Sequence, residues 1–338
     1  MNYHTVINKN TKYYINNIYH RHRFSVAPML HWTDRHCRYF HRLLTKKTLL
    51  YTEMMTTSEI LYNEHNSLRY HETEHPIVLQ IAGSNSVDLI KCAKLAEIHG
   101  YDEINLNIGC PSQRVQHGLF GACLMKHALL VVNNIQNICN TVSIPVTIKT
   151  RIGIDENDNY EFLYNFISTI STNSKCTIFV IHARKAILSG LNPKENRKLP
   201  LLNYQRVYKI KKDFPNLTIV INGGIKSINE IKYHLKYVDG VMMGREAYNN
   251  PNILTKIDHE LYNVSYIQKN HIEIIESLYP YIEYELYHGT HLNHITRHLL
   301  GMFKGMKGAK KWRRYLTENS YKPGANITVI KHALNLIQ

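Results

Sequence analysis

A cysteine at an abrupt boundary is the residue whose type and position first suggest chemistry. Cys110 follows an apolar run at residues 104–108 and precedes a proline and a glycine-containing segment. It is either a small buried hydrophobic residue or a thiol presented at the mouth of a site. No histidine is spaced to form an evident Cys–His pair, which favours a proton donor over a nucleophile. A thiol of ordinary pKa, about 8.5, is protonated at neutral pH and can protonate a carbanion.

Two other apolar runs end in residues that suit a phosphate group. The first closes on Asn222, Gly223 and Gly224, and the second on Gly244 and Arg245. Glycines let backbone amides approach an anion, and an arginine adds a charge-assisted hydrogen bond. Paired glycines can also simply make a turn, so each signal alone is weak.

Further polar residues close three more runs. Gln80, Lys149 and His182 suit the ring of a flavin, whose carbonyl groups need hydrogen-bond donors and whose reduced form is steadied by a nearby cation or histidine. His182 could instead be a buried core histidine. No GxGxxG motif follows a strand-like run, so FMN fits better than FAD or a tightly held NAD. Asn107, close to Cys110, could orient a polar substrate group.

Eight short runs rich in Val and Ile must position these residues. They are continuous rather than alternating in hydrophobicity, as expected for parallel strands covered by helices. Helical patterns lie between them, with Ser86 and Ser227 as candidate N-caps. This α/β pattern predicts a (β/α)8 TIM barrel, whose site is built at the carboxyl ends of its strands. The runs are residues 24–28, 49–54, 76–83, 103–110, 145–153, 176–185, 217–224 and 240–247.

The alternating pattern stops near residue 255, and amphipathic helical patterns follow. Residues 297–331 contain nine Lys or Arg residues and one acid, Glu318. A solvated helix face normally mixes its charges, so this segment predicts a surface for a polyanion. We therefore expect a short basic N-terminal extension at residues 1–22, a catalytic barrel at 23–255 and a small helical domain at 256–338.

The composition bounds the protein class. The chain has 338 residues, of which 44% are hydrophobic and 20% charged, as in globular proteins with a core. The net charge of +15 favours nucleic acid as a partner, although an AT-rich coding bias would also enrich Lys and Asn. Six scattered cysteines argue against a disulfide framework and a metal site. The sequence shows no membrane span and no secretory signal, so we expect a cytoplasmic protein. We also expect a monomer that binds no metal.

Several segments resemble the tRNA-dihydrouridine synthases. They are FSVAPMLHWTDRHCRYFHRLL, LYTEMMTTSEIL, INLNIGCPSQRVQHGLFGACLM, PVTIKTRIGID, VIHARKAILSGLNPKENRKLP, INGGI with GVMMGREA, and GAKKWRRYLTEN. The likeness covers the expected barrel and continues into the tail. The cysteine–proline motif and the segment after His182 resemble the branch that modifies D-loop uridines at positions 20 and 20a.

The resemblance implies FMN as cofactor, NADPH (or NADH) as reductant and a tRNA uridine as substrate. It implies a proton-donor role for Cys110. The implied FMN contacts are Pro28, Met29, Leu30, Gln80, Lys149, His182, Asn222, Gly223, Gly224, Gly244 and Arg245. The implied tRNA contacts are Asn107, Lys194, Arg197, Lys310 and Arg313.

The implied reaction agrees with the residues. Reduced flavin would deliver hydride to C6 of uracil, and Cys110 would protonate C5 after the target base has left its stack. Lys310 stands where the family pattern suggests Arg, so a bidentate contact is lost there. Two rivals remain: an FMN barrel oxidoreductase for a free pyrimidine, like dihydroorotate dehydrogenase, and a non-catalytic RNA-binding protein on a degenerate barrel.

Overall fold

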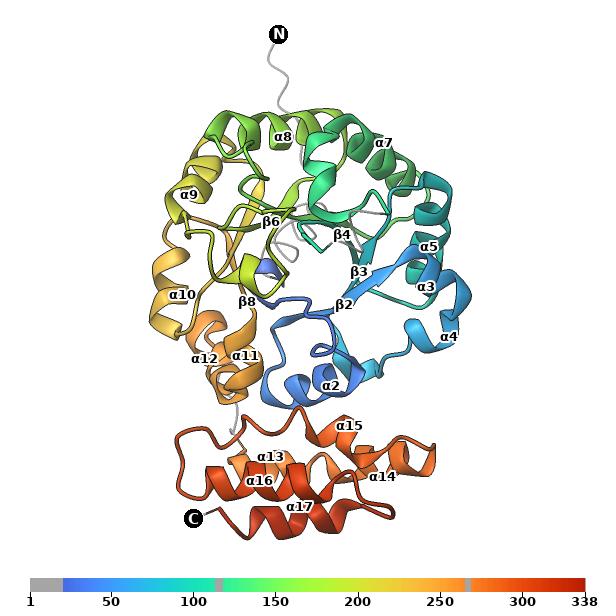
Figure 1. Ribbon diagram of the computed structural model, residues 1–338, viewed down its shortest axis with the longest axis vertical. Coiled ribbons are helices and arrows are strands. Elements are labelled where there is room, and N and C mark those ends of the chain that lie inside the picture. The colour runs from blue at the N-terminus through green and yellow to red at the C-terminus, as the bar shows by residue number, and fades with distance from the viewer. Residues whose placement is uncertain (1–20, 113–117, 265–268, 338) are drawn as a thin grey trace.

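A closed barrel of eight parallel strands forms the centre of the computed structural model, which describes residues 21–112, 118–264 and 269–337. Each strand pairs with the next in sequence, and β1 closes the ring on β8 with Phe24 opposite Val241. This is the predicted TIM barrel (Figure 1). The strands are β1 (Phe24–Val26), β2 (Leu49–Thr56), β3 (Ile77–Ala82), β4 (Glu103–Ile108), β5 (Val146–Arg151), β6 (Ile178–His182), β7 (Thr218–Asn222) and β8 (Gly240–Met243).

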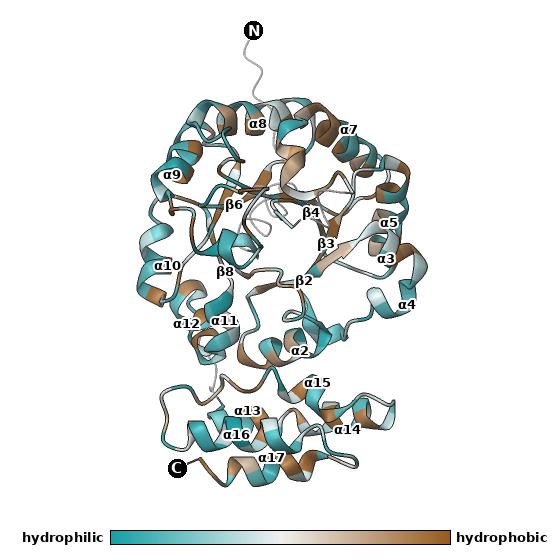
Figure 2. Ribbon diagram, in the orientation of Figure 1, coloured by the Kyte–Doolittle hydropathy of each residue, from teal (hydrophilic) through white to brown (hydrophobic). Residues whose placement is uncertain are grey.

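A ring of helices covers the outside of the barrel. It contains α2 (Arg35–Leu44), α3 (Thr57–Tyr62), α4 (Glu64–Ser67), α5 (Ser86–Ile98), α7 (Ala128–Cys139), α8 (Tyr160–Asn173), α9 (Tyr204–Asp213), α10 (Ile228–His234), α11 (Arg245–Asn249) and α12 (Ile257–Tyr262). Short 3-10 helices lie at η1 (Glu72–Glu74), η2 (Gly121–Lys126), η3 (Glu195–Arg197) and η4 (Pro251–Lys256). Strands β3 and β6 are mainly hydrophobic, whereas α11 is hydrophilic (Figure 2).

Helix boundaries follow capping residues. Ser227 accepts a hydrogen bond from the backbone of Glu230, whose side chain returns the contact, so the predicted N-cap of α10 is confirmed. The prediction for α5 is wrong by one residue. Asn85 caps this helix by accepting from the amides of Val87 and Asp88, and Ser86 is its first helical residue.

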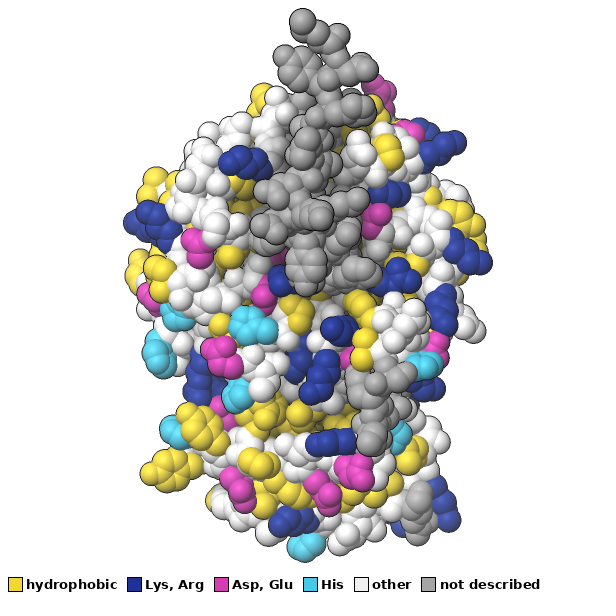
Figure 3. Space-filling view, turned by 180° about the vertical axis from the view of Figure 1, so that it is seen from behind, with side chains coloured by type: hydrophobic (Ala, Val, Ile, Leu, Met, Phe, Trp, Pro, Cys, Tyr) yellow, Lys and Arg dark blue, Asp and Glu magenta, His cyan; other side chains and the backbone are white. Residues whose placement is uncertain are grey.

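A helical region packs against the side of the barrel, next to α2 and α11, at the bottom of the view in Figure 1. It comprises α13 (His271–Glu276), α14 (Tyr279–Tyr287), α15 (Leu292–Thr296), α16 (Ala309–Asn319) and α17 (Ile327–Leu334). Trp312 is fully buried and packs edge-on against Phe303, which anchors α16. From the side opposite to Figure 1, hydrophobic side chains are visible along the junction, and basic and acidic side chains lie interspersed (Figure 3).

The interior of the barrel is partly polar. A small apolar cluster that includes Tyr51, Val180 and Met242 fills one part. Glu103 and Asn105 of β4 are also buried there, while their neighbours Ile104 and Leu106 join the larger core between strands and helices. Strand β4 therefore alternates in polarity, and the expectation of continuously apolar strands is wrong for this strand.

The described residues contain neither a membrane-spanning helix nor a cluster of metal-ligating side chains. Each helix among them is too short or too polar to cross a lipid bilayer. In the same part of the chain, no three His, Cys, Asp or Glu side chains lie together in a way that could hold a metal ion.

Candidate active site

The carboxyl ends of β5, β6 and β7 bring three predicted residues together. His182 and Asn222 are the last residues of β6 and β7 and pair directly in the β6–β7 register, and Lys149 lies two residues before the end of β5. The ammonium group of Lys149 donates to Asn222 Oδ1 at 3.3 Å, and Asn222 Nδ2 donates to the carbonyl of Met242 at 2.8 Å. These hydrogen bonds link Lys149 to Asn222, and Asn222 to β8.

Cations crowd this mouth, and the described part of the chain supplies no acid to pair them. Among the described residues, Lys149, Arg151, Arg184, Arg197 and Arg245 form no ion pair with Asp or Glu. Burial and the charge of Arg151 lower the pKa of Lys149 to about 7. The mouth therefore favours a negatively charged ligand, since burying unpaired cations is otherwise costly.

His182 lies among the same cations. Burial, followed by the charges of Arg151 and Lys149, holds the pKa of its imidazole well below the ordinary value. Its Nδ1 atom is buried and has no hydrogen-bond partner within the described residues. A buried polar atom without a partner is uncommon in a finished core, so a ligand group is the expected partner.

Two consecutive glycines follow β7 where side chains would not fit. Gly223 and Gly224 have φ angles of +124° and +73°. A Cβ atom on Gly224 would lie 2.7 Å from Leu202 Cδ1, and the hydroxyl of Tyr204 donates to the Gly223 carbonyl at 2.7 Å. The glycines therefore satisfy both a backbone conformation and close packing. Gly244, by contrast, has room for a Cβ atom, which would meet Met29 Sδ at 3.7 Å.

The segment after β1 completes this side of the mouth. Pro28 and Met29 are partly buried and Leu30 is 58% exposed. The amide of Met29 donates to Thr33 Oγ1 at 2.9 Å, and Ala27 donates to the carbonyl of Met243 at 2.8 Å. These contacts hold the segment beside the Gly244–Arg245 corner, as the prediction of a shared site requires.

Cys110 lies partly exposed at the end of β4. Asn107 Oδ1 accepts hydrogen bonds from the amides of Gly109 (3.0 Å) and Cys110 (2.9 Å). The sulfur contacts Ser112 Oγ at 3.7 Å, and no described histidine lies within hydrogen-bonding distance of it. Among the described residues, the Cys110 thiol is therefore presented at the mouth without a base to activate it, an arrangement that suits proton donation. The glycine-containing segment that follows includes residues 113–117, which lie outside the described residues.

Arg151 joins the Cys110 segment to a second loop, a link that the sequence did not reveal. Its guanidinium is buried and donates to the carbonyls of Gly109 (2.8 Å), Lys185 (3.0 Å) and Asn196 (3.3 Å). Burial lowers the pKa of Arg151 to about 10. Asn196, also fully buried, hydrogen-bonds both backbone groups of Ile187. Residues 184–200 therefore form an ordered loop around Asn196.

The predicted tRNA contacts fall on separate parts of the surface. Lys194 and Arg197 are exposed on the loop at residues 184–200, and Asn107 lies inside the mouth. Lys310 and Arg313 are exposed on α16 of the helical region. The structure places the first three around the barrel mouth and leaves the last two on the neighbouring body.

Ion pairs and aromatic stacking fix the helical region to the barrel. Asp34, the N-cap of α2, binds Arg297 and lies 3.0 Å from His298 Nε2, while His298 Nδ1 lies 3.1 Å from the Tyr248 hydroxyl. Trp32 stacks on Tyr248 with ring centroids 4.4 Å apart. Burial would raise the pKa of Asp34, but the hydrogen bond and charge of His298 hold it well below its usual range.

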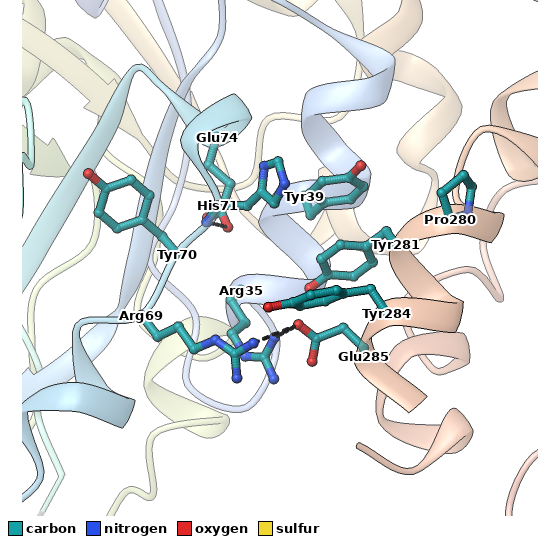
Figure 4. Close-up of a pocket in the computed structure, with 10 residues that line it drawn as sticks. All are labelled: Arg35, Tyr39, Arg69, Tyr70, His71, Glu74, Pro280, Tyr281, Tyr284 and Glu285. Carbon is teal, nitrogen blue, oxygen red and sulfur yellow. Dashed lines mark hydrogen bonds and ion pairs between the residues drawn. The ribbon is translucent and has the colours of Figure 1, made fainter. Parts of the chain in front are cut away.

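A second set of contacts lines a pocket of about 510 Å³ between α2 and α14 (Figure 4). The buried carboxylate of Glu285 binds both Arg35 and Arg69 and accepts from Thr290 at 2.8 Å. Tyr39 stacks on Tyr281 with centroids 3.8 Å apart. We call this pocket and the Asp34 contacts together the seam.

Comparison with known proteins identifies the family to which this chain belongs. A family model described as dihydrouridine synthase (Dus) matches residues 25–338. The chain belongs to this family. Family members are flavin-dependent oxidoreductases that reduce uridine to dihydrouridine.

Several relatives match along nearly the whole chain. A protein of Escherichia coli O6:H1 named tRNA-dihydrouridine(20/20a) synthase is 58% identical over 320 residues, which is 95% of this chain and 97% of the relative. Proteins of the same name from Escherichia coli strain K12 and Yersinia pestis are 59% and 60% identical, over 93% of this chain and 91% of each relative.

The residues at the mouth fit a flavin mononucleotide. Unpaired cations match its phosphate, and the orphan His182 nitrogen can meet a polar atom of the ring. Gln80 is buried beside this space and keeps one amide N–H beyond its bond to Asn105.

Proposed function

We propose that this protein reduces the C5=C6 bond of uridines 20 and 20a in the D loop of tRNA. The observation that carries the proposal is the partly exposed Cys110 thiol on a barrel mouth of unpaired cations, in a dihydrouridine synthase chain. The relatives named above support the choice of tRNA positions. The free-pyrimidine rival would have no use for the basic helical region.

FMN is the proposed cofactor, and NADPH (or NADH) is the proposed reductant. When bound and reduced, FMN supplies the hydride that C6 of the uracil ring accepts. We assign its binding to the backbone at residues 28–30, to Gln80, Lys149 and His182, and to the two glycine-containing strand ends at 222–224 and 244–245. Lys149 and Arg245 supply positive charge for the cofactor's negative groups.

The protein's own chemical step is the protonation of C5. Hydride addition at C6 leaves negative charge on the enolate of the uracil ring, and the Cys110 S–H bond donates its proton to C5. Asn107 holds the Cys110 amide, so the thiol keeps its position relative to the mouth. The resulting thiolate lies near Lys149 and Arg151.

The tRNA contacts are proposed on both bodies. Lys194 and Arg197 would bind RNA beside the mouth, and Lys310 and Arg313 on α16 would bind phosphates farther along the molecule. This assigns catalysis to residues 23–255 and tRNA binding to 256–338, with residues 1–22 as a short basic extension. We propose a monomer that acts in the cytoplasm.

The test uses the FMN-loaded protein, NADPH and an unmodified tRNA transcript that carries uridines at positions 20 and 20a. We expect dihydrouridine at these positions, located by mass spectrometry of nuclease fragments, and its loss from the tRNA of cells that lack the protein. Free uridine reduced as fast as tRNA would instead support the free-pyrimidine enzyme. An FMN-loaded protein that binds tRNA without reducing it would contradict the proposed activity.

A further inference from the structure

A continuous chain of side-chain hydrogen bonds crosses the barrel interior beneath the active site. It climbs β4 through the inward-facing residues Glu103, Asn105 and Asn107. Thr147 of β5 bridges the lower step: its hydroxyl donates to Glu103 Oε1 at 2.6 Å and accepts from Asn105 Nδ2 at 2.8 Å. At the base, His22 Nε2 lies 2.8 Å from Glu103 Oε2.

Gln80 of β3 bridges the upper step. Its Nε2 donates to Asn105 Oδ1 at 2.8 Å, and its Oε1 accepts from Asn107 Nδ2 at 3.0 Å. Asn107 Oδ1 then accepts the amides of Gly109 and Cys110. The chain of contacts therefore runs without a break from the buried base of the barrel to the backbone of Cys110.

Both ends of this chain fix its direction. Backbone N–H groups at the top can only donate, and the Glu103 carboxylate at the base can only accept. Each amide between them has one donor end and one acceptor end, so a single orientation satisfies every contact. Turning one amide over would bring like groups together at the next contact, at a high cost in a buried site.

We propose that Glu103 and Thr147 are positioning residues for the reaction. They are remote from the mouth, but they set the orientation of the Asn105, Gln80 and Asn107 amides and thereby hold the Cys110 backbone in place. This inference rests on the proposed role of Cys110 as proton donor. The claim that these residues orient the amides depends only on the hydrogen bonds described above.

Two substitutions at one position separate polarity from packing. Thr147→Val keeps the shape and removes the hydroxyl, whereas Thr147→Ser keeps the hydroxyl and removes a methyl group. In the FMN-loaded protein without tRNA, we expect amide hydrogen exchange at Gly109 and Cys110 to be about 5- to 30-fold faster in the Val variant, and near wild type in the Ser variant.

Turnover provides the second measurement. The Val variant should lose about tenfold in kcat with KM for tRNA within about twofold, and Ser should restore kcat. Glu103→Gln removes the acceptor-only end and should also speed exchange at both amides, which keeps the test informative if the Val variant does not fold. Unchanged exchange in both Val and Gln variants, or a Ser variant as impaired as Val, would overturn the proposal.

The outcomes separate this inference from the proposed function. If the wild type reduces no tRNA uridine but exchange responds to Thr147→Val, the proposed function fails and the positioning of Cys110 stands. If the wild type reduces tRNA and exchange does not respond, only this inference fails.

Discussion

The barrel mouth and the seam both gather positive charge, but only the seam supplies the matching acids. At the seam, Glu285 binds two arginines and Asp34 binds Arg297 and His298. At the mouth, Lys149 and its neighbouring arginines meet no carboxylate within the described residues. Paired charge between two bodies holds them together, whereas unpaired charge in a concave site awaits a ligand. The same residue types thus have different roles because of their partners.

The largest effect that tests this contrast is chemical. Cys110→Ala should lower single-turnover dihydrouridine formation by about 10²- to 10⁴-fold, because the enolate loses its proton donor. The flavin absorption spectrum and tRNA affinity should persist. Cys139→Ala, on the outer helix α7, is the matched control and should behave as wild type. Equal turnover in both variants would remove Cys110 from the mechanism.

The seam predicts a loss of stability instead. Asp34→Ala removes the N-cap of α2 and leaves His298 and Arg297 without their acid, which should cost about 2–4 kcal/mol in the free energy of unfolding. Urea denaturation followed by circular dichroism measures it. Glu318→Ala, which breaks an exposed pair with Arg314, should leave stability nearly unchanged. Similar losses in both variants would contradict a structural role for the seam.

The mouth predicts a pH dependence of cofactor affinity. Without FMN, the pKa of Lys149 is about 7, because burial and Arg151 disfavour its charged form. Negatively charged FMN favours the ammonium and raises this pKa, so binding takes up a proton. FMN affinity should therefore fall as the pH rises above about 7, by at most about tenfold per pH unit.

Calorimetry in two buffers of different ionisation enthalpy measures this proton uptake directly. Lys149→Met is the control, since its affinity should be weaker and should lack this pH dependence. A wild-type protein that takes up no proton on binding FMN would show that Lys149 does not face the cofactor.

The smallest expected effect lies on α16, where paired and unpaired arginines are adjacent. Arg313 has no acid partner among the described residues, whereas Arg314 donates to Glu318 at 2.7 Å. Arg313→Ala should raise the Kd for tRNA about three- to tenfold and reduce the slope of log affinity against log salt by nearly one. Arg314→Ala should change both less. A larger effect of Arg314→Ala than of Arg313→Ala would contradict the inference that unpaired arginines are the ones that contact RNA.

Much of the fold and part of the site could be predicted from sequence. Each of the eight strands lies within or overlaps its expected run, because Val/Ile-rich segments and capping residues are local signals. The strand-end residues Lys149, His182 and Asn222 meet because parallel strands end on one face. The motif around Cys110 located the thiol correctly at that face.

Other features depend on contacts between distant residues. Asp34 and His298 are 264 positions apart, and neither has a local signature of an interface. Arg151 ends β5, and only the structure shows its three carbonyl partners. In β4, the polar residues Glu103, Asn105 and Asn107 alternate with apolar ones, and this alternation is visible in the sequence. The apolar residues between them led to the prediction of a continuously apolar strand.

The three carbonyl contacts of Arg151 have a practical consequence for protein engineering. They tie the Cys110 segment and the loop at residues 184–200 to one side chain. If either loop alone were exchanged for that of a homologue, carbonyl groups that accept from the buried Arg151 guanidinium could be displaced. Attempts to retarget the enzyme to other RNA positions should therefore transplant both loops and Arg151 as one module.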